Sequence, residues 1–224
     1  MLARIRLMQM TSQGFPIGGY SHSYGLEAAV ESGLVRDEKS VRAWIVDVLA
    51  YSIFTYEAPV LHDMSEAWSA HDLSCVRRLN AEFLAARESA ELRSATVQLG
   101  FSMRELLAAL PGLPDSLSGA LHSMDEPSLP CVWSGTAQAW GIAESESTAA
   151  YLWSWAENQV LAAMKSVPIG QSSAQRVLLH VGENIARFIS SGFLRPADER
   201  SNFAPGLAIV CCQHETQYSR LFRS

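Results

Sequence analysis

The sequence has few charged residues for its length. Of its 224 residues, 18% are Asp, Glu, Lys or Arg, and the formal net charge is −6. An ordinary soluble domain carries about 25% charged residues. The acidic balance argues against nucleic acid as a partner, because nucleic acid binding needs a basic field. The low charge itself has two interpretations, a large core or a surface that a partner covers.

Lysine and paired cysteines are also scarce. Lys39 and Lys165 are the only lysines, against fifteen arginines, and the four cysteines form no Cys-x-x-Cys pair. The adjacent Cys211 and Cys212 could bridge each other only with strain. We therefore expect free thiols in a reducing compartment, which predicts a cytoplasmic protein.

Long apolar runs are missing. The uncharged run at 127–143 contains two prolines, two serines and a glutamine, so it does not predict a membrane span. Near the N-terminus, polar residues from Gln9 to Gln13 interrupt any apolar signal-peptide core. We expect no membrane association.

Patterns typical of β-strands are almost absent, and helical periodicity dominates. Asp37 and Asp72 are expected to cap helices. The cleanest apolar stripe lies in one helix, at Val177, Leu178, Val181, Ile185, Phe188 and Ile189. The sequence predicts one all-α globular domain over residues 1–224, with about eight to ten helices. We expect an irregular segment at 111–130, where four of the nine prolines lie around one short helix, and an irregular C-terminal tail at 205–224.

Motifs for cofactors and metals are missing as well. The phosphate-binding pattern GxxxxGK[ST] does not occur, and no two of the six histidines lie four residues apart. We predict no catalytic residue, no cofactor-binding residue and no structural metal site. His62-Asp63 and His71-Asp72 are typical of solvated helix ends, although a weak ion contact stays open.

The most unusual stretch runs from Phe15 to Glu27 and contains Pro-Ile-Gly-Gly-Tyr-Ser. It is typical of a turn that leads into a helix. At helical spacing, hydroxyls and carboxylates would share one polar stripe formed by Tyr20, Ser23, Tyr24, Glu27 and Glu31. The alternative is a helical hydrolase with Ser21 or Ser23 as nucleophile and His22 as base. Against it, adjacent side chains on a helix diverge by about 100°, and the glycine pattern of a nucleophile elbow is absent.

Two further places have both a structural and a binding interpretation. Lys165 lies in the last turn of a predicted helix, where a cation complements the helix dipole, or it presents a charge to a partner. The last eleven residues mix Tyr, Phe and Arg. Most C-terminal tails fray, but this composition is typical of an interface anchor.

At these three places the sequence resembles the urease accessory protein UreF family. The family pattern Pro-x-Gly-Gly-[Tyr/Phe]-Ser followed by Gly-Leu-Glu appears at 16–21 and 25–27. The pattern Lys-x-Val-Pro-x-Gly-Gln appears at 165–171, and His-Glu-Thr-Gln-Tyr-Ser-Arg-Leu-Phe-Arg-Ser occupies 214–224. The eleven-residue terminal match is highly specific, whereas no such motif occurs at about 72–145.

The resemblance implies an all-α, non-catalytic adaptor that is usually a homodimer. It implies binding to the accessory protein UreD (UreH in some organisms), recruitment of the GTPase UreG, and docking on apo-urease. The adaptor would couple GTP hydrolysis to nickel insertion. It would hold no tightly bound cofactor, and nickel would pass through the assembled complex.

The resemblance also suggests which residues bind partners. Glu27 and Lys165 would lie on the surface that serves UreG, and the tail would fold on binding UreD. We expect eight residues to bind partners: Tyr20, Ser21, Glu27, Lys165, Gln171, Tyr218, Arg220 and Arg223.

Overall fold

Helices account for all the regular structure in residues 1–192 and 195–224, which are the residues that this computed structural model describes. The helices are α1 (Leu2–Thr11), α2 (Leu26–Glu31), α3 (Glu38–Val48), α4 (Ala58–Ser69), α5 (Leu73–Ala85), α6 (Ala90–Ala108), α7 (Asp115–His122), α8 (Leu129–Ala139), α9 (Glu144–Ser166), α10 (Gln171–Ser190) and α11 (Pro205–His214). Short 3₁₀ turns lie at Gly19–Ser21 and Ala197–Glu199. The predicted all-α fold is confirmed.

Side-chain caps fix the starts of several helices where the sequence predicts them. The Asp37 carboxylate accepts a hydrogen bond from the Ser40 N–H at 2.8 Å, and the Ser40 hydroxyl completes a capping box at the start of α3. Asp72 accepts from the Cys75 N–H at 3.0 Å at the start of α5. These caps satisfy backbone donors that a helix cannot pair internally.

α3 and α4 form one continuous helix, Glu38–Ser69, joined by a π-helical stretch at Leu49–Glu57. Pro59 lies in the first turn of α4 and has no N–H to donate. The carbonyl of Thr55, four residues earlier, instead accepts a hydrogen bond from the Ser201 N–H at 3.2 Å. Pro59 therefore interrupts the hydrogen-bond pattern without ending the helix. Counting Glu38–Ser69 once, the described residues form ten helices.

The Glu38–Ser69 helix is also long and apolar enough to cross a membrane by length and composition. Half of its most apolar window is buried inside the protein, and the core helix of a soluble protein passes the same test. Its buried residues include Val41, Ile45 and Leu61, which belong to the main core. We therefore take it as a core helix.

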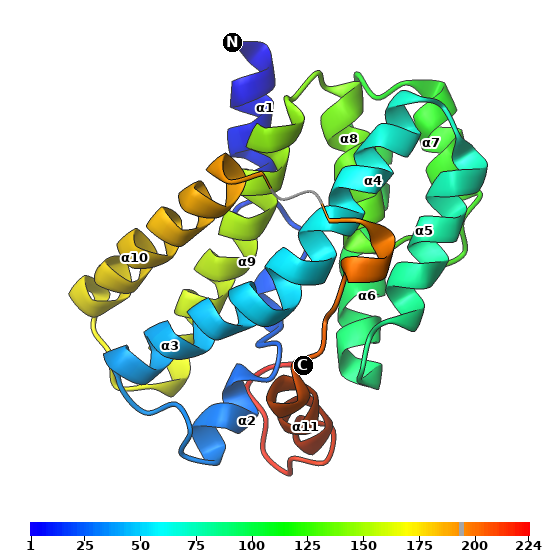
Figure 1. Cartoon of the computed structure of the whole chain (residues 1–224). Helices are drawn as coiled ribbons and strands as arrows, with labels where there is room; N and C mark the ends of the chain where they lie inside the picture. The colour runs from blue at the N-terminus through cyan, green and yellow to red at the C-terminus, as the bar shows by residue number, and fades with distance from the viewer. Residues whose placement is uncertain (193–194) are drawn as a thin grey trace.

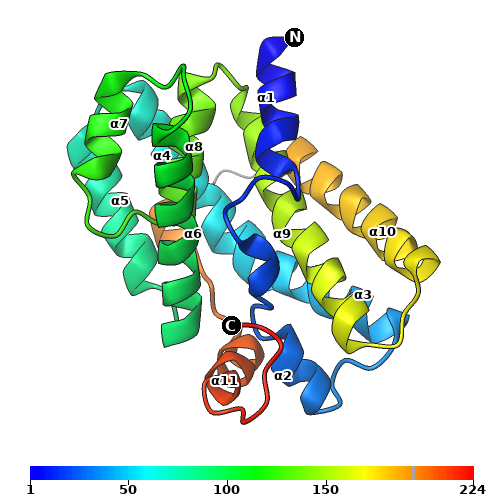
Figure 2. The same ribbon diagram turned by 180° about the vertical axis from the view of Figure 1, so that it is seen from behind.

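α9 is the central helix of the fold. It packs against α10 and α3 on one side and against α4 and α8 on another. Figure 1 shows α3 and α10 beside α9, while α4 to α8 form a second group across the molecule. α1 stands at one end, and α2, α11 and the C-terminus gather at the other (Figure 2). The buried apolar side chains form one connected core, so the described residues make a single domain.

Part of the segment expected to be irregular is helical. Within 111–130 the expected short helix is α7, but within 205–224 the residues Pro205–His214 form α11, which the sequence analysis missed. α11 is apolar on most sides and shows no helical period, so periodicity could not reveal it. Residues 215–224 form turns and bends.

The polar stripe expected along Tyr20–Glu31 is wrong. Tyr24 and Gly25 have φ angles of 51° and 82°, which break the chain between the Gly19–Ser21 turn and α2. These left-handed conformations are incompatible with a continuous right-handed helix. The Ser23 and Glu27 side chains are buried, so they do not line an exposed stripe.

Candidate partner-binding site at the C-terminal tail

The C-terminal residue is held inside the protein. The backbone oxygen of Ser224 accepts hydrogen bonds from the backbone N–H groups of Ser23 and Tyr24 and from the Ser23 hydroxyl, the last at 2.6 Å. The Arg223 N–H donates to the Ser21 carbonyl at 2.8 Å. The chain end is therefore paired with the segment between the Gly19–Ser21 turn and α2 (Figure 2).

Glu27, at the start of α2, binds the backbone of the tail. Its two carboxylate oxygens accept hydrogen bonds from the N–H of Leu221 at 2.6 Å and from the N–H of Phe222 at 3.0 Å. A carboxylate that receives backbone donors in a buried site makes strong, charge-assisted hydrogen bonds. Glu27 therefore acts as an anchor for the tail.

His214 extends this anchor to a second carboxylate. Its Nε2 lies 3.1 Å from Glu27 Oε2, and its Nδ1 lies 2.6 Å from Glu91 Oε2. The other Glu91 oxygen accepts from Arg220 at 2.8 Å. The His214 ring is fully buried and bonds both carboxylates as a donor when both nitrogens carry protons. The network joins α2, α6, α11 and the tail.

α9 fixes the segment that receives the chain end. The Asn158 amide donates to the His22 carbonyl at 2.8 Å, and the Gln159 amide donates to the Ser23 carbonyl at 3.0 Å. The His22 ring is buried, with Nδ1 2.8 Å from the Ser224 hydroxyl oxygen. Burial, together with the nearby Arg223 charge, lowers the pKa of His22 to about 4. His22 is therefore neutral at pH 7.

Lys165 brings the middle of the sequence to the same place. It is exposed at the end of α9, and its ammonium nitrogen lies 5.9 Å from the centre of the Tyr20 ring and 5.4 Å from that of Phe222. Both distances suit cation–π contacts. We use the name tail face for the exposed Tyr20 and Lys165 together with the two exposed residues that flank Phe222 in the sequence, Leu221 and Arg223.

The structure brings most of the predicted binding residues together. Tyr20, Lys165 and Arg223 are exposed on the tail face, and Ser21 lies half-buried beneath it, with its carbonyl paired to the tail. Tyr218 is fully exposed, and Arg220 is exposed and paired with Glu91. Gln171 is exposed at the start of α10, and among the described residues it takes no part in the interactions of the tail.

Glu27 requires a correction. The resemblance implies that Glu27 lies on the surface that serves UreG, but the residue is only 7% exposed and is bonded to the tail. The helical spacing that separately placed Glu27 on a polar stripe does not hold either, because the helix begins only at Leu26. Glu91 carries no motif signal and joins the network through tertiary contacts alone, so the sequence did not predict it. Ser23 was expected only on the polar stripe, and its contact with Ser224 was not predicted.

The hydrolase alternative is wrong. The Ser21 hydroxyl donates to the Gly18 carbonyl at 2.7 Å, and His22 is paired with Ser224 rather than with Ser21. A serine nucleophile needs a base within hydrogen-bond reach. The buried Ser23 hydroxyl is likewise committed to the backbone oxygen of Ser224.

A cavity of about 120 Å³ borders the tail face at Tyr20, which is among its lining residues. Inside it, Arg87 pairs with Glu57 at 2.5 Å, and the Tyr151 hydroxyl donates to the other Glu57 oxygen at 3.1 Å. Burial and the Glu57 charge raise the pKa of Tyr24 and Tyr151, so both stay neutral phenols. The charges of Arg87 and Glu57 compensate each other within the core.

The fold and the tail network define a class: an all-α protein whose polar network holds its own C-terminal tail beside an exposed face. The family model for UreF matches residues 35–182. The urease accessory protein UreF of Dechloromonas aromatica (strain RCB) is 51% identical over 98% of this chain and 96% of its own length. The UreF of Azoarcus sp. (strain BH72) is 47% identical over 100% of this chain and 97% of its own length. The UreF of Methylobacillus flagellatus is 42% identical over 98% of this chain and 97% of its own length.

The chain therefore belongs to the UreF family of urease accessory proteins. This membership supports a role in urease maturation together with other maturation factors. It also makes the protein an accessory factor rather than a catalytic enzyme.

Proposed function

We propose that this protein is a cytoplasmic adaptor for nickel insertion that bridges UreD (or UreH) and the GTPase UreG on apo-urease. It couples GTP hydrolysis in UreG to nickel delivery, acts as a homodimer and keeps no tightly bound cofactor. Eight residues carry the proposed contacts, directly or through the tail: Tyr20, Ser21, Glu27, Lys165, Gln171, Tyr218, Arg220 and Arg223.

One observation supports this proposal above others: three distant parts of the sequence meet at the tail face. The Lys165 ammonium lies against Tyr20 from the N-terminal segment and Phe222 from the tail. The exposed Leu221 and Arg223 flank Phe222 on either side. Aromatic, aliphatic and arginine side chains grouped in this way are typical of the centre of a protein–protein interface.

Glu27 contributes to this surface indirectly. Because it binds the N–H groups of Leu221 and Phe222, it fixes where the tail side chains point. A tail that is already ordered loses little conformational entropy when a partner binds. The earlier expectation of a tail that folds only on binding gives way to a preformed surface.

A substitution of Lys165 tests the proposal. We expect Lys165→Ala to keep the fold, since the side chain is exposed, and to weaken recruitment of UreG to the complex with UreD by about tenfold, the equivalent of about 1.4 kcal/mol. Lys39→Ala is the matched control, because Lys39 is exposed in the first turn of α3. Co-purification of the three proteins with GTP-loaded UreG measures the effect. Equal recovery of UreG with both variants would remove Lys165 from the proposal.

A further inference from the structure

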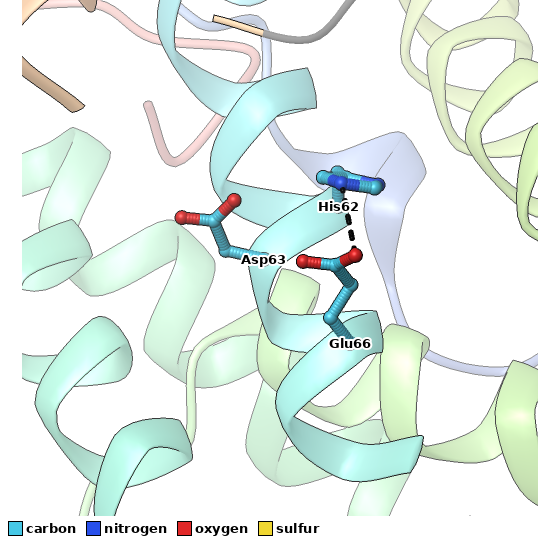
Figure 3. Close-up of side chains that lie close together, drawn as sticks. All are labelled: His62, Asp63 and Glu66. Carbon is cyan, nitrogen blue, oxygen red and sulfur yellow. Dashed lines mark ion pairs between the residues drawn. The ribbon is translucent and has the colours of Figure 1, made fainter. Parts of the chain in front are cut away.

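Three potential metal ligands lie close together on α4, away from the tail network. His62, Asp63 and Glu66 each offer a ligand atom, and these atoms lie within 4.8 Å of one another. Figure 3 shows the Glu66 carboxylate turned toward the His62 ring, with the Asp63 carboxylate on the same turn of the helix. Among the residues that the structure describes, this is the one such group of His, Cys, Asp or Glu side chains.

The separation of two of these atoms fits a shared ion better than a direct bond. His62 Nε2 and Glu66 Oε1 are 3.6 Å apart, which is too long for a hydrogen bond. Two ligand atoms that are each about 2.1 Å from one tetrahedral ion lie about 3.4 Å apart. The i, i+4 spacing on α4 therefore sets a distance that a metal ion can bridge.

Other residues prepare the imidazole for this role. His62 Nδ1 is bonded to the Glu144 carboxylate at the start of α9, and this contact leaves Nε2 turned to Glu66. Metal-binding histidines commonly donate their second ring N–H to a carboxylate, which fixes the tautomer and the ring orientation. Glu144 is thus a positioning residue for His62.

Arg200 limits the affinity of this group for a cation. Its Nη1 lies 2.7 Å from Asp63 Oδ2, so a bound cation competes with the guanidinium for this carboxylate. The Glu66 side chain is 70% exposed, which leaves the group open to solvent. Both features suit an ion that exchanges rather than one that is locked into the fold.

We propose that His62, Asp63 and Glu66 bind a divalent first-row transition-metal ion, with a coordination position open to water. One imidazole with two carboxylates favours ions such as Zn²⁺, Ni²⁺ or Co²⁺ over Mg²⁺, which prefers oxygen ligands alone. This site is separate from the tail face, so it does not depend on the proposed adaptor role.

Titration of the untagged full-length protein with Co²⁺ tests the site, followed by competition with Zn²⁺, Ni²⁺ and Mg²⁺. A Cys212→Ser background removes the exposed thiol as a competing ligand. We expect a visible Co²⁺ absorption band that His62→Gln abolishes, that Zn²⁺ or Ni²⁺ displaces and that Mg²⁺ leaves intact. Unchanged circular dichroism would show that the His62→Gln variant is folded.

His122→Gln is the matched control. His122 Nε2 faces Glu105 Oε1 at 3.7 Å in a similar histidine–glutamate pair, but His122 belongs to no group of three ligands among the described residues. This variant should bind Co²⁺ as the parent does. Arg200→Met should strengthen binding severalfold, because it frees Asp63. No Co²⁺ band, a band that survives His62→Gln, or an equal loss in His122→Gln would overturn the proposal.

Discussion

Burial of His22, which contacts Ser224 at the chain end, makes the stability of the protein sensitive to acid. The pKa of His22 is about 4, below its ordinary value of 6.5, because burial and the Arg223 charge disfavour the imidazolium. Between these two values the unfolded chain binds a proton that the folded chain does not. The contribution of neutral His22 to the free energy of unfolding is therefore fully present above pH 6.5 and is lost as the pH falls toward 4.

A His22→Asn variant tests this pH dependence. For the parent protein, we expect His22 to remove about 3 kcal/mol from the free energy of unfolding between pH 7 and pH 4. The variant has no group to protonate there, so its pH dependence should be shallower by that amount. Urea denaturation across the pH range measures the difference, with His180→Asn on α10 as the control. Parallel curves for parent and His22→Asn would contradict the argument.

At the scale of helices, sequence patterns predicted the structure correctly where one face of the helix is buried and the other is exposed to solvent. In α10, Val177, Val181 and Ile185 are buried as predicted, because the polar side of the helix gives the apolar residues a visible period. The caps at Asp37 and Asp72 were also predictable, since they need only a side chain and the next turn.

The same patterns failed where tertiary contacts decide the structure. α11 is apolar on most sides and has no period, and α2 starts late because Gly25 takes a left-handed conformation. Glu27 and Phe222 are 195 positions apart, so no local spacing could indicate that Glu27 binds the tail there. Shared motifs indicated which segments matter, and only the fold shows that they meet.

The contact of α2 with α11 gives a prediction at this scale. A Cβ added at Gly25 would lie 2.8 Å from Cys211 Sγ, and the φ of +82° disfavours any side chain there. We expect Gly25→Ala to lower the free energy of unfolding by roughly 2–4 kcal/mol and to loosen α11.

Gly33→Ala separates the two causes. Gly33 has a similar φ of +75°, but nothing lies within 4 Å of an added Cβ. Gly33→Ala should therefore lower the free energy of unfolding by only about 1 kcal/mol, from backbone strain alone. Urea denaturation of both variants measures the clash as their difference, and equal losses would show that α11 does not press on Gly25.

Across the whole molecule, the low charge noted in the sequence has a double origin. A single large core runs from Met10 to Phe222 and takes up much of the uncharged composition. The protein also exposes large apolar side chains beyond that core, among them Leu221 and Tyr218 in the tail and Leu2, Ile5 and Met8 on α1. The core bears out the first interpretation of the composition, and the exposed tail residues are the part that the proposed partners would cover under the second.

A substitution of Glu27 tests whether closure of the tail and partner binding are coupled. Glu27→Gln keeps the shape of the side chain but places an amide donor beside the donors of His214, Leu221 and Phe222. Because hydrogen bonds to a buried charge contribute roughly 1.5–3 kcal/mol, we expect a loss of about 2 kcal/mol in stability.

The amides of Leu221 and Phe222 should then exchange hydrogen faster, and UreD binding should weaken by about tenfold, the equivalent of 1.4 kcal/mol. Glu31→Gln, at the exposed end of the same helix, should change none of these. If the tail amides of Glu27→Gln stay protected while UreD binding is lost, Glu27 contacts the partner itself; if the amides open and UreD binding is unchanged, the ordered tail is not the surface that UreD recognises.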